Sequence, residues 1–423
     1  MTNDSSMNTT PLSERVQIGI FGRVNAGKSS VMNALTGQDI AVVADREGTT
    51  TDPVRKAMEL LPIGPVMIYD TPGLSDSSDL GELREEKTRE IIRRCDIAII
   101  VIDAERLKGK EDLSPEEGLT AFFKTGEIPF LVILNKSDRL SPDALEAAIN
   151  NTSDAIGISR EEIFSFCALS PEASEISRLR DRIARTRTDR SNSQTTPLIS
   201  DLIAEGDVVV LVVPVDESAP KGRLILPQQQ VIRDILDSGA IAAVTQPAQL
   251  TKTLNRLGRP PRMVVTDSQA FGEVSKLVPE EVPLTSFSIL MARYKGDLSW
   301  QAQGAKAIEG LKDGARVLIS EGCTHHRQCK DIGTVKLPGW IKEHTGKAFD
   351  YHFTSGGQFP DEKELKSYDL IIHCGGCTLP AREMKWRIAS AGRCGVPITN
   401  YGTMIAYLHG ILDRSMEVFT HKI

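Results

Sequence analysis

Two groups of residues in this chain have the types and the spacing of chemical sites. The first runs Gly22-Arg23-Val24-Asn25-Ala26-Gly27-Lys28-Ser29, with Ser30 directly after it. The second combines Cys323-Thr324-His325 with the downstream run His373-Cys374-Gly375-Gly376-Cys377. Glycines in such a loop let backbone N–H groups close around phosphates, whereas thiols and imidazoles are ligands for soft metals. The chain therefore predicts a phosphate-binding loop and a separate metal centre.

The glycine-rich loop has the local context that a P-loop requires. It follows the apolar run Val16–Phe21, which predicts a strand, and it precedes Ser30–Leu35, which is compatible with a helix. In such a loop Lys28 contacts the β- and γ-phosphates, and the hydroxyl of Ser29 binds Mg²⁺. One match of this kind occurs by chance at a moderate rate, so the prediction depends on the motifs downstream.

Two downstream motifs fit the parts of a nucleotide site that sense the γ-phosphate. Asp70-Thr71-Pro72-Gly73 follows a predicted strand, and its aspartate would organise Mg²⁺ while its glycine N–H contacts the γ-phosphate. Gly48-Thr49-Thr50-Thr51-Asp52 fits the first switch, with Thr50 as the ligand of Mg²⁺ and of the γ-phosphate. The predicted catalytic residues are Lys28, Thr50, Asp70 and Gly73, and the predicted Mg²⁺ ligands are Ser29, Thr50 and Asp70.

Two more motifs indicate that the base is guanine. Asn135-Lys136-Ser137-Asp138 follows the predicted strand Phe130–Leu134. The carboxylate of Asp138 can accept two hydrogen bonds from N1 and N2 of guanine, which adenine cannot supply. Cys167-Ala168-Leu169 fits the loop behind the base. Because these motifs occur in the expected order and most of them lie at strand ends, the chain is predicted to bind GTP.

These motifs resemble the translation-factor-related GTPases, and most closely the branch that contains the tRNA-modification GTPase and Era. Asn25 falls where that branch uses an asparagine to bind K⁺, and Leu74 falls where Ras-type enzymes carry a water-orienting glutamine. The resemblance implies slow hydrolysis of GTP to GDP and phosphate, stimulated by K⁺. On its own, Asn25 is equally compatible with a turn residue in a glycine-rich loop.

The cysteines of the second group follow two predicted strands. Cys323 comes after Arg316–Ser320, and Cys374 comes directly after Leu370–His373. If these strands are parallel neighbours, both thiols lie at the carboxyl edge of one sheet, where open α/β sheets bind their ligands. Two glycines separate Cys374 from Cys377 and permit a tight turn between them. The sequence therefore predicts that the three cysteines share one site.

The chemistry of the cysteine site stays open at this level. A Cys-x-x-Cys pair can be a redox dithiol, and three cysteines with one histidine can close a structural zinc site. Three thiolates can also hold an iron–sulfur cluster whose fourth iron binds His325, His373, Cys329 or an external group. Cys95 and Cys394 fit small buried hydrophobic residues instead.

Composition limits the class of protein. The chain has 423 residues, a net charge of −7 and a pI near 5.7, so it lacks the basic field of many nucleic-acid binders. The polar N-terminus does not resemble a secretory signal, and the apolar run Val208–Val213 is too short to span a bilayer. We expect a cytoplasmic protein that binds neither nucleic acid nor membranes. In that reducing compartment its seven cysteines favour metal binding or burial over disulfides.

The elements that position these residues predict an α/β fold in three parts. Residues 1–190, with a flexible N-terminus of about 13 residues, form a P-loop GTPase domain; 191–285 and 286–423 form two smaller α/β domains. The polar run Thr186–Pro197 is interpreted as a linker. Further strands are predicted at Val66–Tyr69, Ile97–Ile102, Val208–Val215, Ala240–Val244, Met263–Thr266, Ala348–Phe353 and Val396–Thr399. Helices are predicted at Gln228–Asp237, Ala248–Leu257 and Pro380–Ala391.

The cysteine and histidine pattern, behind a GTPase of this branch and an intervening α/β region, resembles the HydF family of [FeFe]-hydrogenase maturation GTPases. The resemblance covers nearly the whole chain. It implies that Cys323, Cys374 and Cys377 bind a [4Fe–4S] cluster with one exchangeable site, for which His325 and His373 are candidate ligands. It also implies a scaffold and metallochaperone that receives a diiron subcluster from the radical-SAM maturases HydE and HydG. The recipient would be apo-[FeFe]-hydrogenase, and the middle region would form a homodimer.

Two other functions compete with this one. An RNA- or ribosome-associated, K⁺-dependent GTPase with a structural zinc site is consistent with the GTPase relatives, but the acidic composition opposes it. A Cys-x-x-Cys oxidoreductase regulated by GTP would hold no metal and would cycle a dithiol. In the preferred interpretation, the nucleotide biases domain arrangement or partner binding, because switch loops order around the γ-phosphate and relax after hydrolysis.

Overall fold

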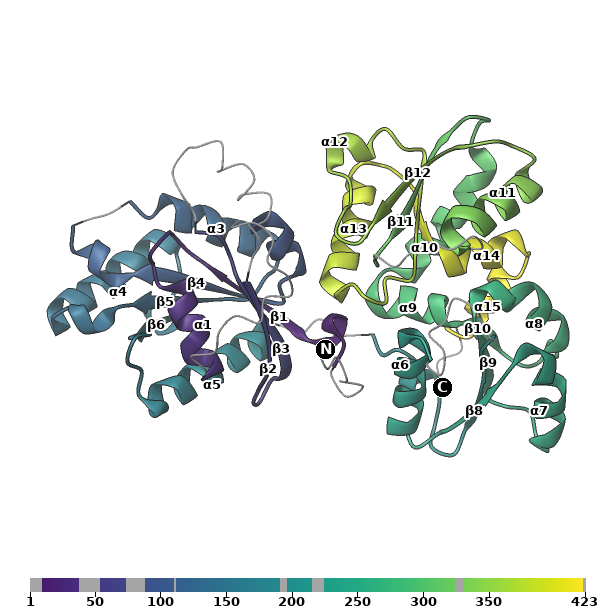
Figure 1. The fold of residues 1–423 in the computed structure, drawn as a ribbon, viewed down its shortest axis with the longest axis horizontal. Coiled ribbons are helices and arrows are strands. Elements are labelled where there is room, and N and C mark those ends of the chain that lie inside the picture. The colour runs from purple at the N-terminus through teal and green to yellow at the C-terminus, as the bar shows by residue number, and fades with distance from the viewer. Residues whose placement is uncertain are drawn as a thin grey trace, which may run out of the picture. The chain divides into compact units, whose positions relative to one another are not determined.

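The computed structural model describes residues 10–37, 54–73, 88–109, 112–190, 196–214, 224–323 and 331–420. The chain divides into two compact units, residues 1–194 and 195–423, and Figure 1 shows a sheet flanked by helices in the first. The predicted α/β class is confirmed, since three mainly parallel sheets form the scaffold. No helix in the described part of the chain is long and apolar enough to cross a membrane.

Unit 1 contains a six-stranded sheet with the order β2-β3-β1-β4-β5-β6. Only β2 is antiparallel to its neighbour. The strands are β1 (Val16–Phe21), β2 (Val54–Leu60), β3 (Gly64–Asp70), β4 (Ile97–Asp103), β5 (Phe130–Asn135) and β6 (Ile163–Phe166). The helices with described bounds are α1 (Lys28–Thr36), α3 (Ser114–Thr125), α4 (Pro142–Ile156) and α5 (Ala173–Arg190).

The central strands of unit 1 are apolar on both faces. Every residue of β1, β4 and β5 is buried. Alternate residues of β4 supply two different apolar clusters, with Ile100 in one and Ile99 in the other. This arrangement follows from the strand period of two and from helices that cover both faces of a parallel sheet. The nearly continuous apolar runs in the sequence are therefore the central strands.

The linker predicted at Thr186–Pro197 is wrong in its first part. α5 continues to Arg190, and the hydroxyl of Thr186 donates to the carbonyl of Arg182 at 2.9 Å, one turn back. Leu179 and Ile183 are fully buried and hold the helix against the sheet. Arginine is a good helix former, so a polar composition rich in arginine does not by itself indicate a linker.

Unit 2 contains two four-stranded sheets that are entirely parallel, with the orders β10-β9-β7-β8 and β12-β11-β13-β14. The first comprises β7 (Val208–Val212), β8 (Ile241–Thr245), β9 (Met263–Thr266) and β10 (Leu284–Ser286). The second comprises β11 (Arg316–Glu321), β12 (Asp350–Ser355), β13 (Leu370–His373) and β14 (Ile398–Asn400). The predicted bounds of β9 and β13 are confirmed to the residue.

Short helices connect these strands. They are α6 (Leu226–Asp237), α7 (Leu250–Arg256), α8 (Phe271–Leu277), α9 (Phe287–Lys295), α10 (Leu298–Lys306), α11 (Leu337–Thr345), α12 (Glu362–Leu365), α13 (Ala381–Arg393), α14 (Tyr401–Leu408) and α15 (Leu412–Glu417). The predicted helices correspond to α6, α7 and α13, with ends that differ by at most two residues. Ser286 caps α9 and Asn400 caps α14, because each side chain accepts a backbone N–H of the first turn.

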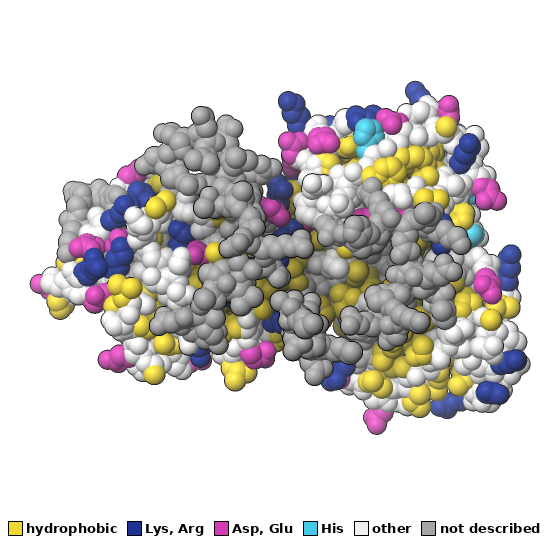
Figure 2. Space-filling view, viewed as in Figure 1, with side chains coloured by type: hydrophobic (Ala, Val, Ile, Leu, Met, Phe, Trp, Pro, Cys, Tyr) yellow, Lys and Arg dark blue, Asp and Glu magenta, His cyan; other side chains and the backbone are white. Residues whose placement is uncertain are grey.

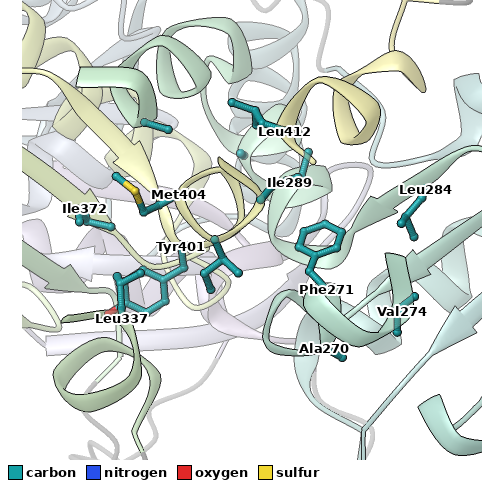
Figure 3. Packing of buried hydrophobic residues seen from close by; sticks show 14 of the residues in the cluster. Ala270, Phe271, Val274, Leu284, Ile289, Leu337, Ile372, Tyr401, Met404 and Leu412 are labelled. Carbon is teal, nitrogen blue, oxygen red and sulfur yellow. The ribbon is translucent and has the colours of Figure 1, made fainter. Parts of the chain in front are cut away.

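One apolar cluster joins the two sheets of unit 2. It contains Val264 of the first sheet and Ile372 of the second. Figure 3 shows Phe271, Ile289 and Tyr401 among the residues between them. Because residues from both halves share one buried cluster, the two sheets belong to the same packed body.

Candidate functional site

The glycine-rich loop follows β1 and has the strained backbone that its sequence requires. Gly22, Asn25 and Gly27 have positive φ angles of 143°, 65° and 93°. A Cβ atom on Gly27 would lie 2.1 Å from the amide nitrogen of Asn135. Glycine is therefore needed at position 27 for space and for conformation. Asn25 adopts the left-handed conformation that asparagine tolerates better than most residues.

Lys28 and Ser29 begin α1, and Asp70, the last residue of β3, contacts Ser29. The ammonium of Lys28 donates to the carbonyls of Gly22 at 3.1 Å and Arg23 at 2.9 Å. Burial lowers the pKa of Lys28, and the charge of Asp70 opposes this shift. The hydroxyl of Ser29 donates to Asp70, whose pKa is raised by burial and lowered by this contact. A hydroxyl and a carboxylate side by side can supply oxygen ligands to Mg²⁺.

Asn135 connects the P-loop to the loop predicted to lie behind guanine. Its amide group donates to the carbonyl of Ala26 at 2.9 Å, and its oxygen accepts the N–H of Ala168 at 3.1 Å. Lys136 donates to the carbonyl of Asn25 at 3.0 Å and pairs with Asp103. The sequence motifs around positions 25, 135 and 168 therefore meet at one edge of the sheet.

The outer residues of these motifs are open to solvent. Asp138 and Leu169 are exposed, beside Lys136 and Ala168 respectively. Cys167 is half-buried, and its sulfur lies 3.6 Å from the hydroxyl of Ser170. Gly73 approaches the P-loop closely, since a Cβ atom there would lie 2.8 Å from the backbone of Val24. The positions predicted to contact base and γ-phosphate are thus accessible or next to the loop.

Arg23 contributes its backbone to the loop but directs its side chain elsewhere. Its Nε donates to Glu116 of α3 at 3.0 Å, and its guanidinium also contacts the carbonyl of Asp112. Glu116 is buried, with 1% of its surface exposed. No motif in the sequence indicates this ion pair, because Glu116 lies in an ordinary amphipathic helix. The Arg23 guanidinium is therefore held by α3, although its residue was predicted among the GTP-binding positions.

Several predicted site residues lie outside the described part of the chain. They are Thr49, Thr50, Leu74, His325 and Cys329. Their roles remain predictions from the sequence.

The two strands that precede the cysteines are parallel neighbours, so the condition for a shared sheet edge is met. β11 pairs with β13 in the register Ser320 to His373, and the N–H of Cys374 donates to the carbonyl of Ser320 at 2.9 Å. This pairing brings Cys323 and Cys374 to the carboxyl edge of one sheet. Cys374 is the next residue after β13, and Cys323 lies two residues beyond β11.

Backbone N–H groups surround the Cys374 sulfur. Gly322 donates to it at 3.0 Å and Gly376 at 3.4 Å. Burial raises the pKa of Cys374 to about 11, and these N–H groups oppose the rise. Nearby negative charge at Cys377 and Glu321 adds to it. Without a bound cation, this environment favours the thiol form of Cys374. With a cation bound, the N–H groups of Gly322 and Gly376 stabilise the thiolate form.

The loop that carries Cys377 is tied to its surroundings on two sides. The hydroxyl of Thr378 donates to the carbonyl of Gly322 at 3.0 Å. The ammonium of Lys295 donates to the carbonyl of Cys377 at 2.9 Å. Burial raises the pKa of the Cys377 thiol, while the charge of Lys295 and the N–H groups of Thr378 and Cys377 oppose this shift.

These residues fit an iron–sulfur cluster by the chemistry of their donors. Cys323 and Cys374 follow the neighbouring parallel strands β11 and β13, and Cys377 comes three residues after Cys374. Backbone N–H groups that point at sulfur are the hydrogen bonds that stabilise thiolate ligands of such clusters. Among the described residues, no group of three or more His, Cys, Asp or Glu side chains is arranged to hold a metal ion.

His373 is engaged by other groups. Its Nδ1 lies 2.8 Å from the carbonyl of Cys374, and its Nε2 lies 2.9 Å from the guanidinium of Arg387. Burial and the Arg387 charge lower the pKa of His373 to about 3. The ring is therefore neutral, with Nδ1–H as donor and Nε2 as acceptor. Since both nitrogens are used, this conformation disfavours His373 as the exchangeable cluster ligand.

Two buried cations near the cysteines were missed by the sequence reasoning. Arg387 is fully buried, pairs with Glu383 at 2.5 Å and donates to the carbonyl of Gly356 at 2.8 Å. Lys295 is 1% exposed. The i, i+4 spacing of Glu383 and Arg387 is a weak sequence signal that Arg387 forms an ion pair. Nothing in the sequence distinguishes Lys295 from a surface lysine.

Comparison with protein families gives matches along most of the chain. Residues 17–136 match the 50S ribosome-binding GTPase model. Residues 198–296 match the hydrogen maturase F dimerization domain, and residues 299–418 match the hydrogen maturase F tetramerization domain.

Individual curated relatives match less than half of this chain. The tRNA modification GTPase MnmE of Heliobacterium modesticaldum is 38% identical over 120 residues, which are 28% of this chain and 24% of that protein. GTPase Der of Campylobacter hominis is 31% identical over 193 residues, 45% of this chain and 40% of that protein. A crystal structure of a probable GTP-binding protein engB aligns with 41% of this chain and 99% of its own, at 21% identity and a TM-score of 0.31.

The chain thus spans less than half the length of these curated relatives. Its other parts match domains that are specific to one family, and they follow the GTPase domain in order. The chain therefore belongs to the hydrogen maturase F family, with segments that match its dimerization and tetramerization domains behind a segment that matches a GTPase domain.

Proposed function

We propose that this protein is a scaffold and carrier that binds a [4Fe–4S] cluster, holds a diiron subcluster and delivers it to apo-[FeFe]-hydrogenase. The observation that carries the proposal is the position of the three cysteines. Cys323 and Cys374 follow neighbouring parallel strands, with Cys377 three residues further on, in the region that matches the hydrogen maturase F tetramerization domain behind a GTPase domain. The diiron subcluster is cargo, received from the radical-SAM maturases HydE and HydG.

The nucleotide site would hydrolyse GTP by positioning and charge stabilisation. Mg²⁺, when bound by Ser29, Thr50 and Asp70, supplies charge neutralisation at the phosphates. Lys28 places its ammonium against the β- and γ-phosphates, and the N–H of Gly73 contacts the γ-phosphate. Asp138 accepts the guanine N–H groups. Water attacks the γ-phosphorus, the bond to the GDP oxygen breaks, and phosphate leaves.

K⁺ would bind at Asn25 and stimulate this hydrolysis. The left-handed backbone of Asn25 places this residue at the exposed rim of the P-loop. The guanidinium of Arg23 is held by Glu116, so this arginine does not supply the positive charge at the phosphates. A bound K⁺ would provide that charge.

Cys323, Cys374 and Cys377 would bind the cluster as thiolates. When bound, the cluster supplies an iron with an exchangeable position, which a carrier requires. His325 or an external group would fill that position, since both ring nitrogens of His373 are engaged. The N–H groups of Gly322 and Gly376 would stabilise the Cys374 thiolate.

The homodimer would form through β8, which ends the strand order of its sheet. Ile241 and Val244 of this strand are 52% and 51% exposed. Hydrophobic side chains also gather in Figure 2 on the face of unit 2 that carries α6 and β8. An edge strand with exposed β-branched residues is a template for pairing with a second copy. The match of residues 198–296 to a dimerization domain supports this assignment.

GTP would act on partner binding rather than on bond formation at the cluster. Switch loops order around the γ-phosphate and relax after hydrolysis, so they can change affinity for a partner. Equal cluster transfer and equal partner affinity with GTP, GDP and no nucleotide would contradict this part of the proposal.

Hydrogenase activation tests the proposal. The protein is purified anaerobically from cells that also express HydE and HydG, and is mixed with apo-[FeFe]-hydrogenase while hydrogen evolution is measured. Wild type and Cys394→Ser should activate the enzyme, whereas Cys377→Ser should not. Cys394 is a matched control, since it lies in the same unit but its sulfur contacts the carbonyl of Glu362.

GTP hydrolysis is measured in parallel and should be equal in all three proteins. Full activation by Cys377→Ser would show that the cysteine assignment is wrong. If wild type activates nothing but binds RNA with an affinity that falls steeply with salt, the RNA-associated GTPase is the better account.

A further inference from the structure

A buried lysine holds the cysteine loop from a distant helix. Lys295 is the last residue of α9 and is 1% exposed. Its ammonium donates to three carbonyls, those of Gly376 at 3.2 Å, Cys377 at 2.9 Å and Leu379 at 2.8 Å. A lysine has three N–H donors, so the three contacts satisfy its ammonium.

The acceptors distinguish this lysine from an ordinary helix-terminal one. A lysine in the last turn commonly reaches the last carbonyls of its own helix and remains in solvent. The acceptors of Lys295 lie 81 to 84 residues further along the chain. Burying an ammonium group costs free energy unless the group is hydrogen-bonded. A lysine at this buried position therefore serves either the local contacts with the cysteine loop or the packing of the helix.

The contacts with Lys295 orient two peptide groups of the loop. In a trans peptide the C=O and the N–H that follows it point in opposite directions. Because the carbonyls of Gly376 and Cys377 point at Lys295, the N–H groups of Cys377 and Thr378 point away from it. Lys295 therefore fixes the direction of both peptide groups in the cysteine loop.

We propose that Lys295 is a positioning residue of the cysteine site. It holds the backbone of residues 376–379 around Cys377 through three carbonyls, and its charge stabilises the reduced state of a bound cluster. This inference rests on the proposed function, because it requires that the three cysteines bind an iron–sulfur cluster. Lys295 lies in the segment that matches the dimerization domain, while the loop lies in the tetramerization domain.

The expected sign follows from charge. A [4Fe–4S] cluster with three thiolate ligands is already anionic, and one-electron reduction adds a further negative charge. A nearby ammonium stabilises the more negative state, and N–H groups on a ligand sulfur have the same effect. Removal of the Lys295 charge should therefore lower the midpoint potential of the cluster.

Three substitutions separate charge from packing. Lys295→Met keeps the length of the side chain but removes the charge and the donors. Lys295→Gln removes the charge but keeps two N–H donors, and Lys295→Arg keeps both charge and donors. Lys347→Met is the matched control, because Lys347 also bridges backbone carbonyls, those of Glu309 at 3.0 Å and Leu311 at 2.8 Å.

The full-length proteins are reconstituted with iron and sulfide, and the midpoint potential is measured by EPR-monitored titration. The potential should fall in Lys295→Met and Lys295→Gln and stay near the wild-type value in Lys295→Arg and Lys347→Met. In the cluster-free proteins, amide hydrogen exchange of residues 376–379 should be fastest in Lys295→Met.

The outcomes distinguish this inference from the proposed function. If wild type takes up no iron–sulfur cluster, the proposed function fails and the inference fails with it. If wild type binds a cluster but its potential is unchanged in Lys295→Gln, the Lys295 assignment alone is overturned. Should Lys295→Met not fold, the Gln and Arg variants still decide, since a potential that falls equally in both would indicate packing rather than charge.

Discussion

The nucleotide site and the cysteine site are built in different ways. The nucleotide site takes its shape from backbone, with positive φ angles at Gly22, Asn25 and Gly27 and with Asn135 tied to the carbonyl of Ala26. The cysteine site uses three side chains at two strand ends and is held by a cation from a distant helix, Lys295. The shape of a site that is built from backbone is specified by its sequence motif. A site that is built from side chains also depends on residues such as Lys295, which no motif identifies.

The largest effect is expected at Lys28. Lys28→Ala should reduce the rate of GTP hydrolysis by about 10²- to 10³-fold, the cost of removing one charged group from the transition state. Iron and sulfide content should not change, because the two sites lie in separate units. Lys124→Ala is the control, since Lys124 donates to carbonyls of Ile156 and Gly157 away from the P-loop. A parallel loss of iron would contradict the independence of the two sites.

Asn135→Ala tests the hydrogen bond that links Asn135 to the backbone of the P-loop. Two buried hydrogen bonds are lost, to Ala26 and Ala168, and GTP affinity should fall by about 10- to 100-fold. Titration with a fluorescent GTP analogue measures this change. Wild-type affinity in the variant would mean that the P-loop keeps its shape without Asn135.

A smaller and more selective effect is expected at Asn25. Asn25→Ala should abolish the stimulation of hydrolysis by K⁺ relative to Na⁺, while the rate in Na⁺ stays the same. Phosphate release is measured in matched chloride salts of both cations. Stimulation that survives the substitution would leave Asn25 as a turn residue only.

The smallest effect is expected at the edge of β8. Val244→Lys places a charge on an exposed apolar strand and should weaken the homodimer by about tenfold, roughly the loss of one buried apolar side chain. Light scattering across a concentration series measures the dimer. Thr251→Lys on the nearby helix α7 serves as a surface control, because Thr251 is exposed. An unchanged dimer in Val244→Lys would place the interface elsewhere.

Much of the fold could be predicted because buried parallel strands read as apolar runs. Met263–Thr266 and Leu370–His373 were predicted with their observed bounds. β10, with only Leu284, Thr285 and Ser286, is too short to give such a run. The polar end of α5 was predicted as part of a linker, although two buried residues of this helix, Leu179 and Ile183, lie one helical turn apart.

Some residues of the two sites could be predicted from the sequence and others could not, depending on how far along the chain their partners lie. Residues of the P-loop and of the Asn135 motif act through neighbours in sequence, so a local pattern identifies them. Glu116 and Lys295 act across 93 and 82 residues, and their partners are backbone groups or a single arginine. Such contacts depend on how helices pack on the sheets, and a single sequence carries no signal for them.

The most direct test of the central claim is an anaerobic analysis of iron and acid-labile sulfide, with EPR after reduction by dithionite. We predict about four irons and four sulfides per chain and the signal of a reduced [4Fe–4S] cluster. One zinc per chain and no sulfide would contradict the account, since the cysteines would then form a structural site.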